Sequence, residues 1–168
     1  MITKQEDFIR RLIREELDKL EHNITVAYHV TNQVFDNFKL EKIGMNHPKD
    51  KHGFFFTDSE WNVNYMINNY IKLKEKNIYV YTCELTFENP YTIVDLKQHP
   101  ESQYMNIGGS GMDGWNIFDR FTESIISDVF DKKRDSIVFK DFIVIFNPQK
   151  IKILKIQKIK NEEIFVKL

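Results

Sequence analysis

Short stretches of alternating apolar and polar residues recur along this chain, and such alternation is typical of half-buried β-strands. A long alternating stretch, 78–87, ends at the turn-forming pair Asn89-Pro90. Another, 24–30, lies near the start of the chain. Shorter apolar runs predict further strands at 53–57, 136–139, 142–147, 150–157 and 162–167.

Two stretches within this series of strands have the apolar spacing of helices. Asp58 or Ser59 can cap a helix that runs to about Lys76, and a second helix is predicted from Trp115 to Phe130. The glycine-containing stretch 98–114 before it is predicted to be a loop. Helices among many short strands predict an α+β fold with a largely antiparallel sheet.

Residues 1–22 are predicted to form an amphipathic helix that precedes a single domain, 23–168. Thr3 and Glu6 have the spacing of a capping box, and an apolar stripe follows them. We expect this helix to pack on its own domain. The alternative is a docking element, through which the protein forms a homo-oligomer or captures a partner. The stripe consists of Phe8, Ile9, Leu12, Ile13, Leu17 and Leu20.

Composition narrows the class of protein. The chain has 168 residues, 42% of them apolar, and a net charge of −1. These values predict a globular core and exclude both a disordered chain and a strongly basic nucleic-acid binder. Lysines crowd the last nineteen residues, which we interpret as solvated edge strands. Cys83 is the single cysteine, so no intrachain disulfide can form and a reducing compartment is expected. No apolar run is long enough for a membrane helix and no signal peptide is recognised, so we expect no membrane partner and a cytoplasmic location.

Three short motifs occur in a fixed order and carry the candidate chemistry. The first is Tyr28-His29-Val30-Thr31, the second is Gly53-Phe54-Phe55-Phe56-Thr57-Asp58, and the third runs from Asp141 to Pro148. They offer an imidazole, an aromatic platform and a carboxylate. Together these groups could bind a nucleotide and promote the departure of a leaving group from it.

The order and spacing of these motifs resemble ADP-ribosyltransferase-like domains over about residues 24–155. The likeness is to small bacterial and phage-encoded members, which share a His-Tyr-Glu-type layout with the poly-ADP-ribose polymerases. The resemblance implies an NAD cleft between split, largely antiparallel sheets. It also implies cleavage of the bond between nicotinamide and ribose, with NAD as co-substrate, in a bacterial or phage-infected cell.

By this resemblance, His29 takes the first motif position and hydrogen-bonds a ribose hydroxyl of NAD, beside Thr31. The backbone of Val30, where the family usually has glycine, meets the nicotinamide amide. Imidazole suits this role because it can donate and accept without a net charge near neutral pH. The alternative is a core histidine whose nitrogens are satisfied by neighbouring backbone.

Gly53 opens the second motif, and Phe55 stands where the family usually has a tyrosine that stacks on nicotinamide. Phenylalanine keeps the aromatic face and loses the hydroxyl. Tyr65 and Tyr70 on the following helix are alternative platforms. The structural alternative is that the aromatic residues of this strand belong to the core.

Asp141 is the candidate acid of the third motif, where the family has glutamate. Bond cleavage builds positive charge on the ribose, which a carboxylate stabilises. Counting back from Phe146-Asn147-Pro148 shifts the frame by one residue and leaves no acid at that place, so the two registers make opposite predictions. Asp135 and Glu123 are fallback acids, with Gln149 as a polar neighbour, and a solvated turn residue is the structural alternative.

The function implied by the resemblance is mono-ADP-ribosyl transfer from NAD to a macromolecular acceptor, protein rather than nucleic acid. The alternative is a catalytically weak or inactive member of the same fold that serves as a binding module. Hydrolysis of NAD without an acceptor is a third possibility. No metal is expected, since His47-x-x-Asp50-x-His52 supplies too few ligands.

Overall fold

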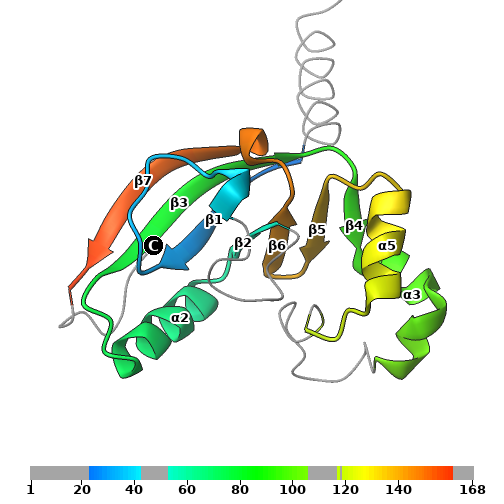
Figure 1. Cartoon of the computed structure of the whole chain (residues 1–168), viewed down its shortest axis with the longest axis horizontal. Coiled ribbons are helices and arrows are strands. Elements are labelled where there is room, and N and C mark those ends of the chain that lie inside the picture. Colours follow the sequence, from blue (N-terminus) through cyan, green and yellow to red (C-terminus); the bar gives the residue numbers. More distant parts are fainter. Residues whose placement is uncertain (1–22, 43–52, 106–116, 118, 161–168) are drawn as a thin grey trace, which may run out of the picture.

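The computed structural model of the chain describes residues 23–42, 53–105, 117 and 119–160. These residues form strands and short helices in an α+β arrangement (Figure 1). In chain order the elements are β1 (Asn23–Thr31), η1 (Leu40–Lys42), β2 (Phe54–Phe56), α2 (Glu60–Lys72), β3 (Ile78–Phe87), β4 (Pro90–Thr92), α3 (Ile93–Gln98), η3 (Pro100–Tyr104), α5 (Glu123–Asp131), β5 (Ser136–Phe139), β6 (Phe142–Ile145), η4 (Pro148–Lys150) and β7 (Ile151–Ile159).

The described strands form two sheets. Sheet A has the order β1-β3-β7 with antiparallel neighbours, and sheet B has the order β2-β6-β5-β4, in which β4 and β5 run parallel. One bridge joins the sheets: the Tyr28 N–H donates to Thr57 O at 2.7 Å, and the Thr57 N–H donates to Tyr28 O at 3.0 Å. The expected α+β class with largely antiparallel sheets is confirmed.

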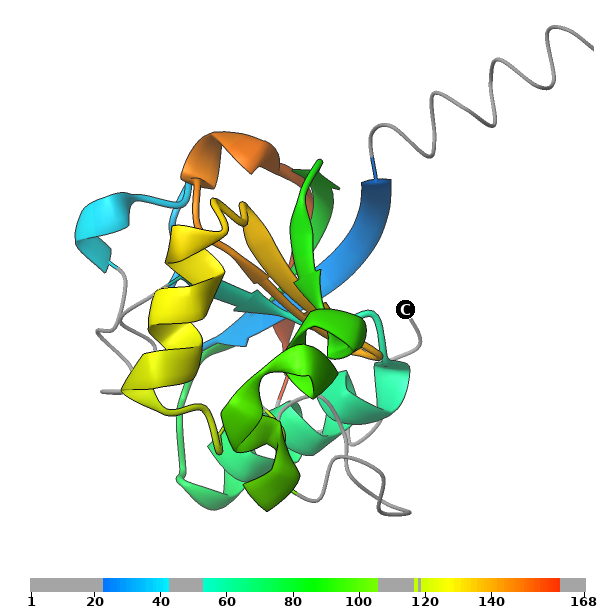
Figure 2. The same cartoon turned by 90° about the vertical axis from the view of Figure 1, so that its right-hand side faces the viewer.

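The layers run from α2 through sheet A and sheet B to α3 and α5 (Figures 1 and 2). Between the sheets lies an inner cluster. To this cluster β1 contributes Ala27, β2 contributes Phe54 and Phe56, and β3 contributes two aromatic residues, Tyr81 and Phe87, with Cys83 and Leu85. A second cluster packs sheet B against α3 and α5, and a third packs α2 against the outer face of sheet A. Sheet B is therefore covered on both faces, and all four residues of β6 are buried. This double burial explains why β6 is a continuous apolar run and does not alternate.

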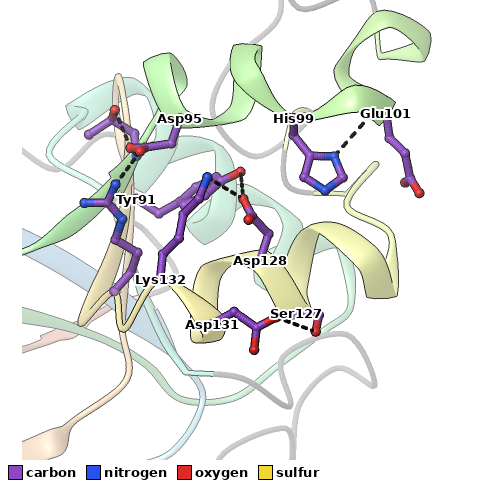
Figure 3. A network of polar contacts seen from close by, with 10 residues as sticks. Tyr91, Asp95, His99, Glu101, Ser127, Asp128, Asp131 and Lys132 are labelled. Carbon is purple, nitrogen blue, oxygen red and sulfur yellow. Dashed lines mark hydrogen bonds and ion pairs between the residues drawn. The ribbon is translucent and has the colours of Figure 1, made fainter.

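The edge of sheet B is held to α5 by the polar contacts shown in Figure 3. The Tyr91 hydroxyl donates to Asp128 at 3.2 Å, and Lys132 forms an ion pair with the same carboxylate at 2.9 Å. Arg134 pairs with Asp95 on α3. Because Tyr91 is fully buried, its hydroxyl needs this partner to avoid the cost of an unpaired polar group.

Several element boundaries differ from the prediction. Residues 119–122 are not helical, and α5 begins at Glu123 because Thr122 caps it, with the Ile125 N–H donating to Thr122 Oγ1. Two elements, β4 and α3, were not expected from the sequence, and η3 lies in the stretch that was predicted to be a loop. These elements are short, so they carry little periodicity. Residues 1–22 and 162–167 lie outside the described part of the chain.

Two residues after the last residue of α2 and of α5, a lysine adopts the left-handed conformation: Lys74 at φ 59° and Lys133 at φ 51°. At the end of α2, the Lys74 N–H donates to Ile71 O and the Glu75 N–H donates to Tyr70 O. This pair of bonds is the Schellman motif, whose left-handed position favours glycine because a Cβ is strained there.

We therefore expect Lys74→Gly to raise the free energy of unfolding by about 0.5–1 kcal/mol. The matched control is the preceding residue, Leu73, which has φ −77° and is exposed. Leu73→Gly should lower stability by a similar amount, about 0.5–1 kcal/mol, because glycine there adds only backbone entropy to the unfolded chain. Urea titrations of the three proteins measure both changes, and a destabilised Lys74→Gly protein would contradict the strain argument.

Candidate functional site

A cavity of about 410 Å³ opens where the end of β1 meets the start of β2. This size lies within the usual range of small-molecule sites. His29 and Thr31 come from β1, Gly53 to Phe55 come from the β2 side, and the segment that follows β1 supplies the rest of the lining. That segment contributes Gln33, Val34, Phe35, Asp36, Asn37, Phe38, Lys39 and Lys42.

His29 lies on the inner face of sheet A, among aromatic rings. It is the cross-strand partner of Tyr81 on β3, and its ring centroid is 6.3 Å from that of Tyr81. The rings of Phe38 and Phe56 lie at 5.4 and 5.7 Å. The imidazole of His29 is thus a polar ring among aromatic rings, and the packing of these rings fixes its orientation.

A single backbone group sets the proton arrangement of His29. Nδ1 lies 2.8 Å from Phe55 O. Because a carbonyl oxygen can only accept, Nδ1–H is the donor, and the neutral ring keeps an acceptor lone pair at Nε2. Burial of the ring lowers the pKa of His29 below its ordinary value, and the bond to Phe55 O offsets part of this effect. The ring is therefore neutral at physiological pH and can accept a hydrogen bond from a ligand hydroxyl.

The chain turns away from β1 at Thr31, whose side chain is almost fully buried. The Gln33 N–H donates to Thr31 Oγ1 at 3.2 Å, which satisfies the buried hydroxyl and redirects the backbone into the cavity wall. Threonine at this position therefore shapes the lining, whatever the cavity binds.

Gly53 allows the chain to enter β2 against β6. A Cβ on Gly53 would lie 2.6 Å from Val144 Cγ1 and 2.9 Å from Ile145 O. Neither distance is possible without movement of β6, so the absence of a side chain is a packing requirement at the edge of the cavity.

The structure brings His29, Thr31, Gly53 and Phe55 to one cavity and leaves the other predicted residues elsewhere. Within β2, Phe54 and Phe56 belong to the inner cluster, while Phe55 packs against the cluster on the opposite face of sheet B. The Phe55 ring contacts Phe142, with 5.6 Å between centroids. It is the backbone carbonyl of Phe55 that contacts His29.

Val30 and Tyr65 lie outside the cavity lining. Val30 is buried in the cluster beneath α2. Tyr65 is on the exposed side of α2, where it stacks on Trp61 with 5.5 Å between ring centroids and an interplanar angle of 10°. Tyr70, the alternative platform, packs partly buried against the cluster beneath α2.

Asp141 lies in the turn between β5 and β6, outside the cavity lining. Asn62 Nδ2 donates to Asp141 Oδ2 at 2.6 Å, and the same amide nitrogen donates to Thr57 Oγ1 at 3.2 Å. Desolvation raises the pKa of Asp58, and the negative charge of Asp141 nearby adds a smaller increase. Asp141 therefore joins the β5–β6 turn to the start of α2.

The other polar candidates also lie apart from the cavity. Asp135 accepts hydrogen bonds from the Glu88 and Asn89 N–H groups, and Glu123 opens α5. Gln149 belongs to η4. In the described part of the chain no cluster of three or more potential ligands could hold a metal ion, and His47, Asp50 and His52 are not described.

No candidate site residue was predicted from the sequence in the segment from Gln33 to Lys42. Its two phenylalanines, Phe35 and Phe38, are the signal that was available, because aromatic residues in a polar segment suggest docking onto a core. Phe38 is almost fully buried in the inner cluster. The segment also brings Asp36 and the two lysines, Lys39 and Lys42, to the cavity.

Comparison with known proteins gives a fold relative. No family model and no curated protein matches the chain. The fold is similar to that of a chain in the crystal structure of the Mycobacterium tuberculosis MbcT–MbcA toxin–antitoxin complex, with a TM-score of 0.51 and 8% sequence identity. The match covers 84% of this chain and 87% of that chain. The chain thus shares its α+β fold with that chain.

This comparison corrects the function expected from the sequence. The prediction of mono-ADP-ribosyl transfer to a macromolecular acceptor, with an inactive binding module of that family as its alternative, is wrong. The fold similarity is to a chain of a toxin–antitoxin complex and not to such a transferase. None of the helices in the described residues has the length and apolar character needed to cross a membrane.

The lowered pKa of His29 predicts a dependence of stability on pH. Below the ordinary pKa of 6.5 the unfolded chain binds a proton at this residue that the folded chain does not, so stability falls as pH falls through that value. We expect the melting temperature of the wild type to drop more steeply between pH 7 and pH 5 than that of His29→Phe. Thermal scans of both proteins test this, because the other histidines are common to both. Equal slopes would contradict the assignment.

Proposed function

We propose that this protein is the toxin of a toxin–antitoxin pair, and that it binds NAD in the cavity at His29 and breaks the bond between nicotinamide and ribose. The acceptor of the ribosyl group is a small nucleophile from solvent. The fold similarity supports the toxin part of the proposal. The observation that carries the NAD part is the neutral, oriented imidazole at the wall of a cavity of ligand size.

His29 would bind a ribose hydroxyl. With Nδ1–H committed to Phe55 O, Nε2 is left as an acceptor, and a sugar hydroxyl is a suitable donor. A charged imidazolium could not accept this bond and would repel the positive ribosyl group that forms during cleavage. Burial among aromatic rings, which keeps the imidazole neutral, therefore matches the proposed role.

The charged residues of the cavity suit two charged groups of the proposed reaction, the diphosphate of NAD and the positive ribosyl group. Lys39 and Lys42 supply positive charge for the diphosphate of NAD. Nicotinamide leaves with the electron pair of the broken bond, and the ribose carbon becomes positive until water attacks it and releases a proton. Asp36 is the acid in the lining, and we assign it to the stabilisation of this positive charge.

An antitoxin partner is the second part of the proposal. The structural relative comes from a complex of a toxin with its antitoxin, which supports a protein partner for this chain. Production of the wild-type chain in a bacterial host should then slow growth, whereas a variant that cannot use NAD should be tolerated at the same protein level.

The central prediction concerns His29→Asn. Asparagine places its amide nitrogen near the position of Nδ1 and keeps a donor for Phe55 O, but it removes the acceptor at Nε2. We expect kcat/KM for nicotinamide release from NAD to fall at least about tenfold. Release is measured in buffers with and without inorganic phosphate, so that both water and an anionic acceptor are offered.

His99→Asn is the matched control for His29→Asn. His99 lies before η3, where its Nδ1 accepts the Glu101 N–H at 3.2 Å, and it does not line the cavity. The control should release nicotinamide at the wild-type rate. Equal rates for wild type and His29→Asn would remove His29 from the site, and a wild type that neither binds nor cleaves NAD would overturn the proposed function.

A comparison of two acids tests the assignment of the carboxylate. Asp36→Asn should lower kcat by roughly 10²-fold with little effect on KM, because the charge it stabilises exists only in the transition state. Asp141→Asn, which alters the acid predicted from the sequence, should change kcat by less. Steady-state kinetics of both variants measures these changes. A larger loss of kcat in Asp141→Asn than in Asp36→Asn would assign the stabilising carboxylate to Asp141.

A further inference from the structure

The wall of the cavity at Phe35 is held by one buried tyrosine from another strand. Tyr81 is fully buried, and its ring stacks on that of Phe35 with 4.4 Å between centroids and an interplanar angle of 11°. The Phe35 N–H donates to the Tyr81 hydroxyl oxygen at 2.7 Å, and the Tyr81 hydroxyl donates to Phe35 O at 3.0 Å. One side chain therefore satisfies both backbone polar groups of one residue.

This double contact matters because the wall has few other polar anchors. Between described residues, no backbone-to-backbone hydrogen bond outside the helices and strands involves residues 33–38. The turn at Thr31 fixes the start of the segment, and burial of Phe38 fixes its end. The Tyr81 hydroxyl supplies the polar contact in between, at the residue whose ring lies 6.2 Å from that of His29.

We infer that Tyr81 is a positioning residue of the cavity, whose hydroxyl holds the wall at Phe35 in the shape that a ligand of His29 requires. Tyr81 is not among the residues that line the cavity. It acts on the site through Phe35, and the identity of the ligand as NAD rests on the proposed function. The hydroxyl should therefore influence ligand binding more than the chemical step.

The test is Tyr81→Phe in the full-length protein. Phenylalanine keeps the stacked ring and removes the hydroxyl. Hydrogen exchange at the Phe35 amide should become at least about tenfold faster, because this amide loses its acceptor. For NAD cleavage, KM should rise roughly tenfold while kcat stays within about twofold, which is the pattern of a lost binding contribution.

Tyr91→Phe is the matched control. Tyr91 is also fully buried and does not line the cavity. Its substitution also removes a hydroxyl hydrogen bond, the one to Asp128 in the network of Figure 3. It should show a comparable drop in melting temperature, an unchanged Phe35 amide and an unchanged KM. An equal rise of KM in both variants would attribute the effect to general loss of stability and overturn the inference.

The remaining outcomes separate this inference from the proposed function. An unprotected Phe35 amide in Tyr81→Phe with an unchanged KM would overturn the positioning role, as would unchanged protection of that amide. A wild type with no NAD binding or cleavage would overturn the proposed function, and with it NAD as the ligand. In that case, exchange at the Phe35 amide still decides whether Tyr81 holds the wall.

Discussion

The bridge between Tyr28 and Thr57 is the constraint on which the arrangement of this molecule depends. Its two backbone hydrogen bonds join sheet A to sheet B. Because β1 alternates, the residue after Tyr28 faces inward, and His29 is carried to within hydrogen-bond distance of Phe55 O. Because α2 begins soon after Thr57, the helix is placed over the outer face of sheet A. One short contact thus positions the imidazole, the cavity and a covering helix.

The imidazole is placed where a polar group is costly, and the structure limits that cost with a single hydrogen bond. One nitrogen is satisfied by backbone, and the ring is kept neutral by its aromatic surroundings. In the same arrangement, no hydrogen bond from another described residue occupies the second nitrogen of His29. A structural histidine and a ligand-binding histidine are therefore compatible here, and the residue serves both purposes in our proposal.

The wall of the cavity follows a different principle. Residues 33–38 form no strand or helix, and their shape depends on side chains that dock onto sheet A and on the Tyr81 hydroxyl. Stacked and edge-on rings in this region give the segment a defined position without regular backbone pairing.

Those strands and helices that have a clear apolar periodicity could be predicted from the sequence. It predicted β3 with its bounds, β5 with its bounds, and the α+β class, because alternating and continuous apolar runs reflect burial that any packing must supply. It also singled out His29, Thr31, Gly53 and Phe55, which meet at one cavity. Only in the folded structure is it visible which atom of a residue makes a given contact. Phe55 contributes its carbonyl because its ring is packed on the other face of sheet B, and Asp141 is held by Asn62 from a helix distant in sequence. The folded structure also brings Asp36, Phe35 and Tyr81 to the site. These contacts join residues whose separation along the chain leaves no local pattern, so they become visible only when the two sheets are packed together.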